Sequence, residues 1–241
     1  MPDDPAELLE GQRLARLRGC VGGCHGQGLE GGLFFDEPKI ARIVAPNLTE
    51  VVREYSDAEL ERVIRRGVRR DGRSVFAMPS PMFAHLTDED LGRIIAFLRS
   101  EPAVDGPAPV FALGPLGRVG LVMRQFPPLA EEIPSQAAAS GDLSPALRRG
   151  EYLALTICTE CHGQDLRGSP EGSPPDLAIA GAYSGDEFRL LMSTGIGLGG
   201  RALGLMTAVA QSRFSYLHDD EVQDLHAYLR TLGAARQAAG E

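Results

Sequence analysis

The apolar residues of this chain recur three and four positions apart in several segments, which is the spacing of a helix with one buried face. The pattern is clearest in residues 88–99 and 219–232. Its apolar positions there are Leu91, Ile94, Ile95 and Leu98, and then Val222, Leu225 and Leu229. Polar residues suited to capping a helix precede both segments. We therefore predict one helix that ends near residue 99 and another that ends near residue 232.

Helix-start signals predict more helices. Ser144 followed by Pro145 is a serine N-cap with proline at the first helical position. Further helices are predicted over residues 6–18, 57–66 and 185–193, the last two after Ser56 and Ser184. Every predicted element is helical, so the sequence indicates an all-α fold.

The two halves of the chain repeat one pattern, which is the signature of duplicated structural units. Residues 67–78 and 195–206 share two glycines, an arginine and a terminal methionine at one constant offset. Four flanking stretches correspond as well. They are 46–48 and 175–177, 55–59 and 183–187, 83–90 and 214–221, and 96–99 and 227–230. We predict two tandem domains, residues 5–100 and 144–235.

A linker, residues 101–143, joins the two predicted domains. It is rich in proline and alanine, and apolar residues such as Val110 and Phe111 make it too hydrophobic for a solvated linker. We expect an extended strap packed over one or both domains, with a short helix near residues 116–124.

Length and charge narrow the class of protein. A chain of 241 residues suits two small domains, and its formal net charge of -9 argues against nucleic acid as a partner. No apolar run is long enough to span a bilayer. The first residues, Met1-Pro2-Asp3-Asp4, are acidic and do not resemble a signal peptide.

The candidate chemistry centres on Cys158-Thr159-Glu160-Cys161-His162. Two cysteines separated by two residues and followed by histidine are typical of c-type haem attachment. Each thiol adds to one haem vinyl group, one helical turn brings the two sulfurs into place, and the histidine binds the iron. A zinc site would require four nearby ligands, and a thioredoxin-like motif would not need the histidine.

Cys20, Cys24 and His25 form a second motif with one extra residue between the cysteines. Gly22 and Gly23 tolerate unusual backbone conformations, so the extra residue can bulge. We therefore predict two covalently bound haem c groups and no disulfide bond. Haem c is attached outside the cytoplasmic membrane, so we expect a periplasmic protein whose export signal or membrane anchor lies outside this sequence.

The sixth iron ligand separates an electron carrier from a catalyst, because an open position admits peroxide, oxygen or nitric oxide. Met78 and Met206 hold equivalent positions, each after a glycine-containing loop and before the last helix of its domain. We expect an extended segment there to cross the distal haem face, and we predict both methionines as ligands. The alternative for each is plain core packing.

Pro46 and Pro175 also occupy equivalent positions, downstream of His25 and His162. A proline carbonyl placed there can accept a hydrogen bond from the far imidazole N–H. That bond fixes the ring and raises its basicity as a ligand, and we predict this role for both prolines.

Two further pairs of residues match between the halves, Tyr55 with Tyr183 and Arg73 with Arg201. Each tyrosine either bonds a haem propionate or simply packs, and the residues leave both alternatives open. Each arginine is a candidate to neutralise a propionate charge.

Residues 11–20, Gly-Gln-Arg-Leu-Ala-Arg-Leu-Arg-Gly-Cys, together with Cys-His, Pro-Asn-Leu, Met-Pro and a terminal Leu-x-x-Leu helix, resemble the class I cytochrome c domain. The second half resembles it as well. Together they are similar to the bacterial dihaem cytochromes c that serve periplasmic dehydrogenases or terminal oxidases. The resemblance implies His25 and His162 as proximal ligands, Met78 and Met206 as distal ligands, and Pro46 and Pro175 as histidine-bonding prolines. The extra residue between the first two cysteines departs from the family pattern. It leaves undecided whether Cys20 forms a thioether with the haem.

The main hypothesis is an electron carrier of the respiratory chain and not an enzyme by itself. It passes single electrons from a periplasmic donor, such as a dehydrogenase, to a downstream acceptor or oxidase. The rival is a dihaem enzyme, a peroxidase or a sulfur-compound oxidoreductase. A peroxidase needs a haem that opens its distal side and acid–base groups nearby, and matched methionines argue against this. A sulfur enzyme of the known sort needs a spare cysteine for the iron, and a gas sensor needs a weak or missing methionine.

Overall fold

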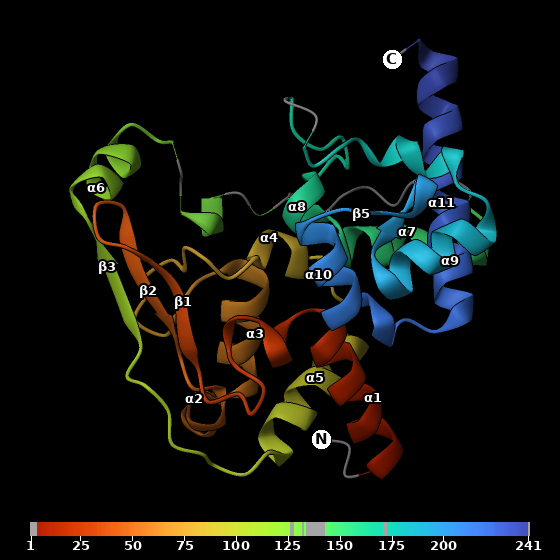
Figure 1. Ribbon diagram of the computed structural model, residues 1–241. Helices are drawn as coiled ribbons and strands as arrows, with labels where there is room; N and C mark the ends of the chain where they lie inside the picture. Colours follow the sequence, from red (N-terminus) through yellow and green to blue (C-terminus); the bar gives the residue numbers. More distant parts are fainter. Residues whose placement is uncertain (1–3, 126–127, 132, 134–142, 171–172, 241) are drawn as a thin grey trace. The chain divides into compact units, whose positions relative to one another are not determined.

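The computed structural model describes residues 4–125, 128–131, 133, 143–170 and 173–240. The chain divides into two compact units, residues 1–80 with 87–133 and residues 81–86 with 134–241. Both units are mostly helical (Figure 1), which confirms the predicted fold class. Among the described residues, no helix is both long enough and apolar enough to cross a membrane.

The first unit is built around the packing of its first helix on a helix late in its sequence. α1 (Pro5–Leu17) packs on α5 (Asp88–Ser100), and α2 (Leu48–Glu54) and α3 (Asp57–Arg66) also contact α5. The predicted apolar positions of α5 are buried. A short helix, α4 (Ser80–Phe83), follows the loop after α3, and its residues 81–83 are assigned to the second unit.

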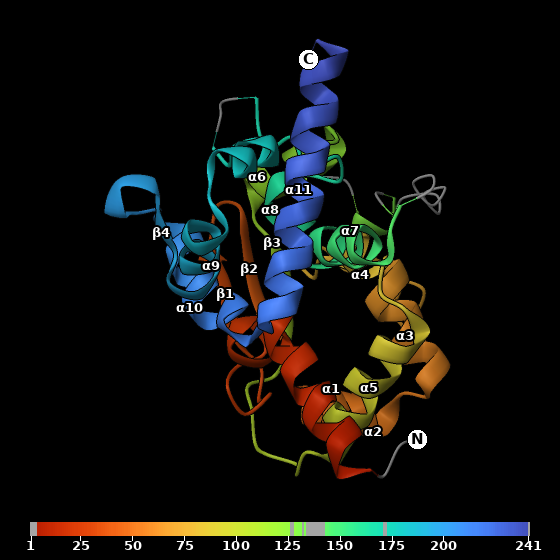
Figure 2. The same ribbon diagram turned by 90° about the vertical axis from the view of Figure 1, so that its right-hand side faces the viewer.

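The second unit repeats this arrangement. α7 (Pro145–Ile157) packs on α11 (Asp219–Ala239), with Ser144 as N-cap as the sequence predicts. The shorter helices between them are α8 (Thr159–His162), η3 (Leu177–Ala182), α9 (Gly185–Thr194), η4 (Leu198–Gly200), α10 (Leu205–Ser212) and η5 (Phe214–Tyr216). The predicted end of the last helix near residue 232 is wrong, because α11 continues to Ala239 (Figure 2).

The first helix of each unit crosses its main partner helix, α5 or α11, at a glycine. A Cβ added at Gly11 would lie 2.2 Å from the carbonyl oxygen of Arg93 in α5. One added at Gly150 would lie 2.1 Å from the carbonyl oxygen of Asp224 in α11. Glycine therefore lets the two backbones touch at both crossings, which matches the sequence repeat.

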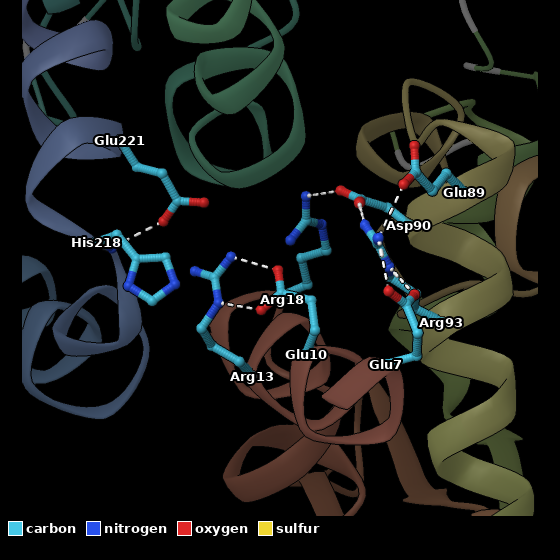
Figure 3. A network of polar contacts seen from close by, with 9 residues as sticks. All are labelled: Glu7, Glu10, Arg13, Arg18, Glu89, Asp90, Arg93, His218 and Glu221. Atoms are coloured by element: carbon cyan, nitrogen blue, oxygen red, sulfur yellow. Dashed lines mark hydrogen bonds and ion pairs between the residues drawn. The ribbon is translucent and has the colours of Figure 1, made fainter. Parts of the chain in front are cut away.

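Ion pairs reinforce the α1–α5 crossing (Figure 3). Arg93 bonds Glu7 of α1 at 2.5 Å. Arg18, the residue after α1, bonds Asp90 of α5 at 3.1 Å, and its side chain is only 1% exposed. A charge buried this deeply is costly without a partner. The pair therefore fixes the end of α1 two residues before Cys20.

A small antiparallel sheet in the first unit was not predicted. β1 (Gly32–Glu37) pairs with β2 (Ala41–Ala45), and β2 pairs in turn with β3 (Val110–Leu113). The register runs from Gly32↔Ala45 to Glu37↔Ala41 in the first pair and from Ala41↔Leu113 to Val44↔Val110 in the second.

Part of the linker packs as a strap on the first unit. β3 joins the sheet, and Phe111 stacks on Phe76 with 4.7 Å between the ring centroids. The short helix predicted near residues 116–124 is confirmed as α6 (Pro115–Val122). Linker residues 126–127, 132 and 134–142 lie outside the described residues.

The helix after each matched tyrosine begins with a capping box. Ser56 accepts the Glu59 N–H at the start of α3 while the Glu59 carboxylate accepts the Ser56 N–H. Ser184 and Glu187 do the same at the start of α9. Each box satisfies two N–H groups that a helix otherwise leaves without partners.

Alanine at either crossing glycine is expected to destabilise the protein, because the new methyl group forces two backbones apart. Gly11→Ala and Gly150→Ala should each lower the free energy of unfolding by about 1–3 kcal/mol, a common cost of overpacking. Guanidinium unfolding followed by circular dichroism measures this. Gly92→Ala on α5 is the control, because a Cβ there meets nothing within 4 Å. It should raise stability by about 0.5–1 kcal/mol, and equal effects at all three sites would contradict the close crossings.

The capping box of α3 is expected to weaken at acid pH. Hydrogen bonds from Arg70 and Ser56 lower the pKa of Glu59 from 4.5 to about 2. Because the folded-state pKa lies below the unfolded value, ionised Glu59 stabilises the fold above that value, and this contribution is lost as the pH falls toward 2. Glu59→Gln should therefore destabilise the protein at neutral pH and progressively less at acid pH, measured by urea unfolding over a pH series. A destabilisation independent of pH would contradict this account.

Candidate haem-attachment sites

The second cysteine motif forms a single helical turn. α8 follows α7 after Cys158, whose carbonyl oxygen accepts the N–H of Cys161 at 3.2 Å and that of His162 at 2.9 Å. Cys158 is buried and Cys161 is exposed. This turn is the local structure that the spacing predicts for attachment to two vinyl groups.

The first motif departs from a helical turn. Val21 is extended (φ -92°, ψ 132°), and Gly22 is left-handed with a φ of 77°. Glycine adopts that region without the clash that a side chain causes. The extra residue between Cys20 and Cys24 is therefore accommodated in a bulge, as the glycines predict. None of the chain's four cysteines, all of which are described, forms a disulfide bond.

Both candidate proximal histidines hold the same hydrogen bond. Nδ1 of His25 lies 2.8 Å from the carbonyl oxygen of Pro46, and Nδ1 of His162 lies 2.8 Å from that of Pro175. A carbonyl can only accept, so Nδ1 donates its hydrogen and Nε2 carries the lone pair that iron requires. This is the arrangement that orients a ligating imidazole.

The loop after each histidine is closed by the same backbone hydrogen bonds. In each unit an N–H donates to the histidine carbonyl, and another donates to the carbonyl of a buried leucine in the left-handed region, with a φ of 62° or 61°. In the first unit the N–H of Gly31 donates to the carbonyl of His25 at 2.9 Å, and that of Leu48 to the carbonyl of Leu29 at 2.8 Å. In the second unit the N–H of Gly168 donates to the carbonyl of His162 at 2.8 Å, and that of Leu177 to the carbonyl of Leu166 at 3.0 Å. The repeat therefore extends to the local geometry of both loops.

The residue after each proline has a different partner in the two units. Asn47 donates its Nδ2 hydrogen to the Val104 carbonyl oxygen in the strap, at 2.6 Å. Asp176 instead pairs with Arg236, whose side chain is 11% exposed, near the end of α11. Sequence reasoning missed Arg236 because it ended the helix too early. The alanine-rich residues 233–239 favour helix and were the available signal.

Burial affects the titrating groups of both motifs. It lowers the pKa of His25 and of His162, while the bonds to Pro46 and Pro175 act in the opposite direction. The Asp176 carboxylate also acts to raise the pKa of His162. Burial raises the pKa of the Cys158 thiol to about 12. The neutral imidazole, the form that binds metals, is thus favoured at both histidines.

The candidate propionate residues lie in matching places. Tyr55 follows α2, and the guanidinium carbon of Arg70 lies 5.2 Å from the centroid of its ring. Tyr183 follows η3 and contacts Phe188 edge-on, with 6.5 Å between the two ring centroids. Arg73 and Arg201 are exposed and lie on the short hairpins after α3 and α9. Their roles toward a haem stay predictions.

The two candidate methionine ligands lie in different local structures. Met78 lies in a bend between α3 and α4, whereas Met206 is the second residue of α10. The expectation of an extended segment is therefore wrong at Met206. The hydroxyl of Thr207 bonds both the Gly195 carbonyl oxygen and the Leu203 N–H, which fixes the start of α10 against the preceding hairpin. Both methionines are half-buried, and ligation by them stays a prediction.

Each unit thus supplies the donor groups that covalent haem attachment requires. Two thiols lie close in sequence beside an imidazole whose Nδ1–H is already bonded to a carbonyl. Thiols form thioethers with haem vinyl groups, and the Nε2 of each histidine would bind the iron of a haem held there. The residues present fit a c-type haem in both units.

Gly22→Ala is expected to disturb the bulge in the first motif. Its φ is +77°, and a Cβ would lie 2.9 Å from Nε2 of Gln27. The left-handed conformation should cost an alanine about 1–2 kcal/mol of unfolding free energy and lower the fraction of protein with haem on Cys20 and Cys24. Denaturant unfolding and mass spectrometry of the tryptic peptide measure the two effects. Gly32→Ala, where a Cβ meets nothing within 4 Å, is the control, and an equal response would refute the role of the bulge.

Comparison with known proteins identifies the repeated unit. The family model described as Cytochrome c matches residues 8–101 and again residues 147–233. The gluconate 2-dehydrogenase cytochrome c subunit of Pantoea cypripedii is 27% identical over 286 residues, covering 97% of this chain and 62% of that protein.

Two more relatives match this chain at a similar sequence identity. The cytochrome c subunit of the alcohol dehydrogenase (quinone) of Gluconacetobacter polyoxogenes is 27% identical, covering 96% of this chain and 57% of the relative. The fructose dehydrogenase cytochrome subunit of Gluconobacter japonicus is 27% identical, with 96% and 54% covered. The chain thus spans between half and two thirds of the length of these relatives. The two family matches take in most of its residues, and the chain belongs to the cytochrome c family.

Proposed function

We propose that this chain is a dihaem cytochrome c that carries single electrons from a dehydrogenase to a downstream acceptor, in the periplasm. Two cytochrome domains, residues 5–100 and 144–235, each hold one haem, and residues 101–143 join them. The chain passes electrons and does not itself transform a substrate.

One observation carries the proposal. The imidazole Nδ1 lies 2.8 Å from a proline carbonyl oxygen beside a cysteine pair, and this arrangement occurs once in each unit. Duplicated attachment sites suit a protein that moves electrons between two centres. Cys20, Cys24 and His25 would hold the first haem, and Cys158, Cys161 and His162 the second. Membership of the cytochrome c family implies haem c as the cofactor.

The residues around the iron decide between carrier and catalyst. Haem supplies reversible one-electron chemistry, and its protein ligands set the potential and the access of small molecules. Met78 and Met206 are proposed to close the sixth positions, so that neither haem binds a substrate. Tyr55, Tyr183, Arg73 and Arg201 are proposed to contact propionates.

The relatives support a dehydrogenase as the electron donor. Their names describe cytochrome subunits of gluconate, alcohol and fructose dehydrogenases, and none of these three names points to a peroxidase. The partner is therefore proposed to be a dehydrogenase.

Haem content and axial ligation test the proposal together. Intact mass and the pyridine haemochrome spectrum should show two covalently bound haems. Alanine at Cys158 and Cys161 should remove one haem, and alanine at Cys20 and Cys24 the other.

Near-infrared magnetic circular dichroism of the oxidised protein should then show two low-spin His/Met centres. Met78→Ala and Met206→Ala should each abolish one of these signals. A high-spin or bis-histidine centre in the unmodified protein would instead indicate catalysis or sensing at that haem, and a single haem would contradict the dihaem assignment.

A further inference from the structure

Arg236 ties together both ends of the loop that carries the second histidine. One guanidinium nitrogen bonds the carboxylate of Asp176, and another bonds the carbonyl oxygen of Asp165. Asp165 lies three residues after His162, and Asp176 directly follows Pro175, whose carbonyl accepts the His162 hydrogen bond. The guanidinium therefore bridges the two chain segments that position the imidazole.

In the first unit the residue after the proline carries no charge. This unit shares the histidine–proline bond and both backbone bonds, but Asn47 stands where the second unit has Asp176. The Asn47 amide bonds the Val104 carbonyl oxygen of the strap. The two loops thus differ in one partly buried ion pair, provided by Arg236 in the last turn of α11, as well as in length and in the β1–β2 pair of the first unit.

We propose that Arg236 is a positioning residue that sets the redox potential of the second haem by holding the Pro175–Asp176 segment and balancing the Asp176 charge. The inference rests on the proposed function, because it requires a haem on His162. Arg236 acts through Pro175 and Asp176 and does not itself touch the iron ligand.

The direction of the shift in redox potential follows from the charges beside the haem. Oxidised haem iron carries one more positive charge than reduced iron, so a nearby anion stabilises the oxidised form and lowers the midpoint potential. Loss of Arg236 leaves the Asp176 carboxylate uncompensated beside the histidine-bonding proline. Loss of the Asp176 charge leaves the arginine cation uncompensated. The Arg236 side chain is 11% exposed and that of Asp176 is 37% exposed, so solvent screens this partly buried pair less than a fully exposed one.

Spectroelectrochemical titration of the holoprotein tests the inference, with Arg236→Gln and Asp176→Asn as opposed variants. Arg236→Gln should shift one of the two haem transitions to lower potential, and Asp176→Asn should shift the same transition to higher potential. The other transition should stay unchanged and serves as an internal reference. Arg230→Gln removes the same charge from an exposed position on α11 and should shift neither transition.

The possible results distinguish a failure of the proposed function from a failure of the inference about Arg236. Absence of covalent haem at Cys158 and Cys161 overturns the proposed function and this inference together. Two bound haems with unchanged potentials in both variants overturn the inference alone. Shifts of the same sign in both variants also overturn it, because a merely structural role lowers stability without reversing the sign of the potential shift.

Discussion

A hydrogen bond from a histidine ring to a proline carbonyl is the constraint on which each unit of this protein depends. It joins residues 21 positions apart in the first unit and 13 positions apart in the second. The bond forms only if the helix before the cysteines is anchored and the following loop folds back. The glycine crossings anchor the helix. Two backbone bonds, one to the histidine carbonyl and one to the carbonyl of a left-handed leucine, fold the loop. Helix packing and loop geometry thus serve the orientation of one imidazole in each half.

Features that depend on neighbouring residues could be read from the sequence. Ser144 before Pro145 marks the start of α7, and the serine caps mark α3 and α9, because capping is decided within one turn of helix. The internal repeat located both proline carbonyls. The attachment chemistry followed from the spacing of the cysteines and the histidine directly after them.

Features that depend on distant contacts could not be read in this way. The third strand of the sheet, β3, comes from a segment more than sixty residues downstream of β2. The sequence pattern of β1 and β2 does not indicate this pairing. Met206 lies in a helix because the Thr207 hydroxyl bonds Gly195 and Leu203, contacts that no periodicity encodes. The partner of Asp176 lies 60 residues away on α11, so the ion pair became visible only with the fold.

The third strand also bears on how such a chain can be divided in evolution. A recombination breakpoint at residue 101, where the repeat ends, would separate β2 from β3. It would also remove Phe111, the stacking partner of Phe76. The exposed edge of β2 would then present unpaired backbone groups to other chains, a known route to aggregation. A breakpoint after α6 would leave the sheet intact. The transferable module of the first half is therefore the cytochrome repeat together with its strap, and it is longer than the module of the second half.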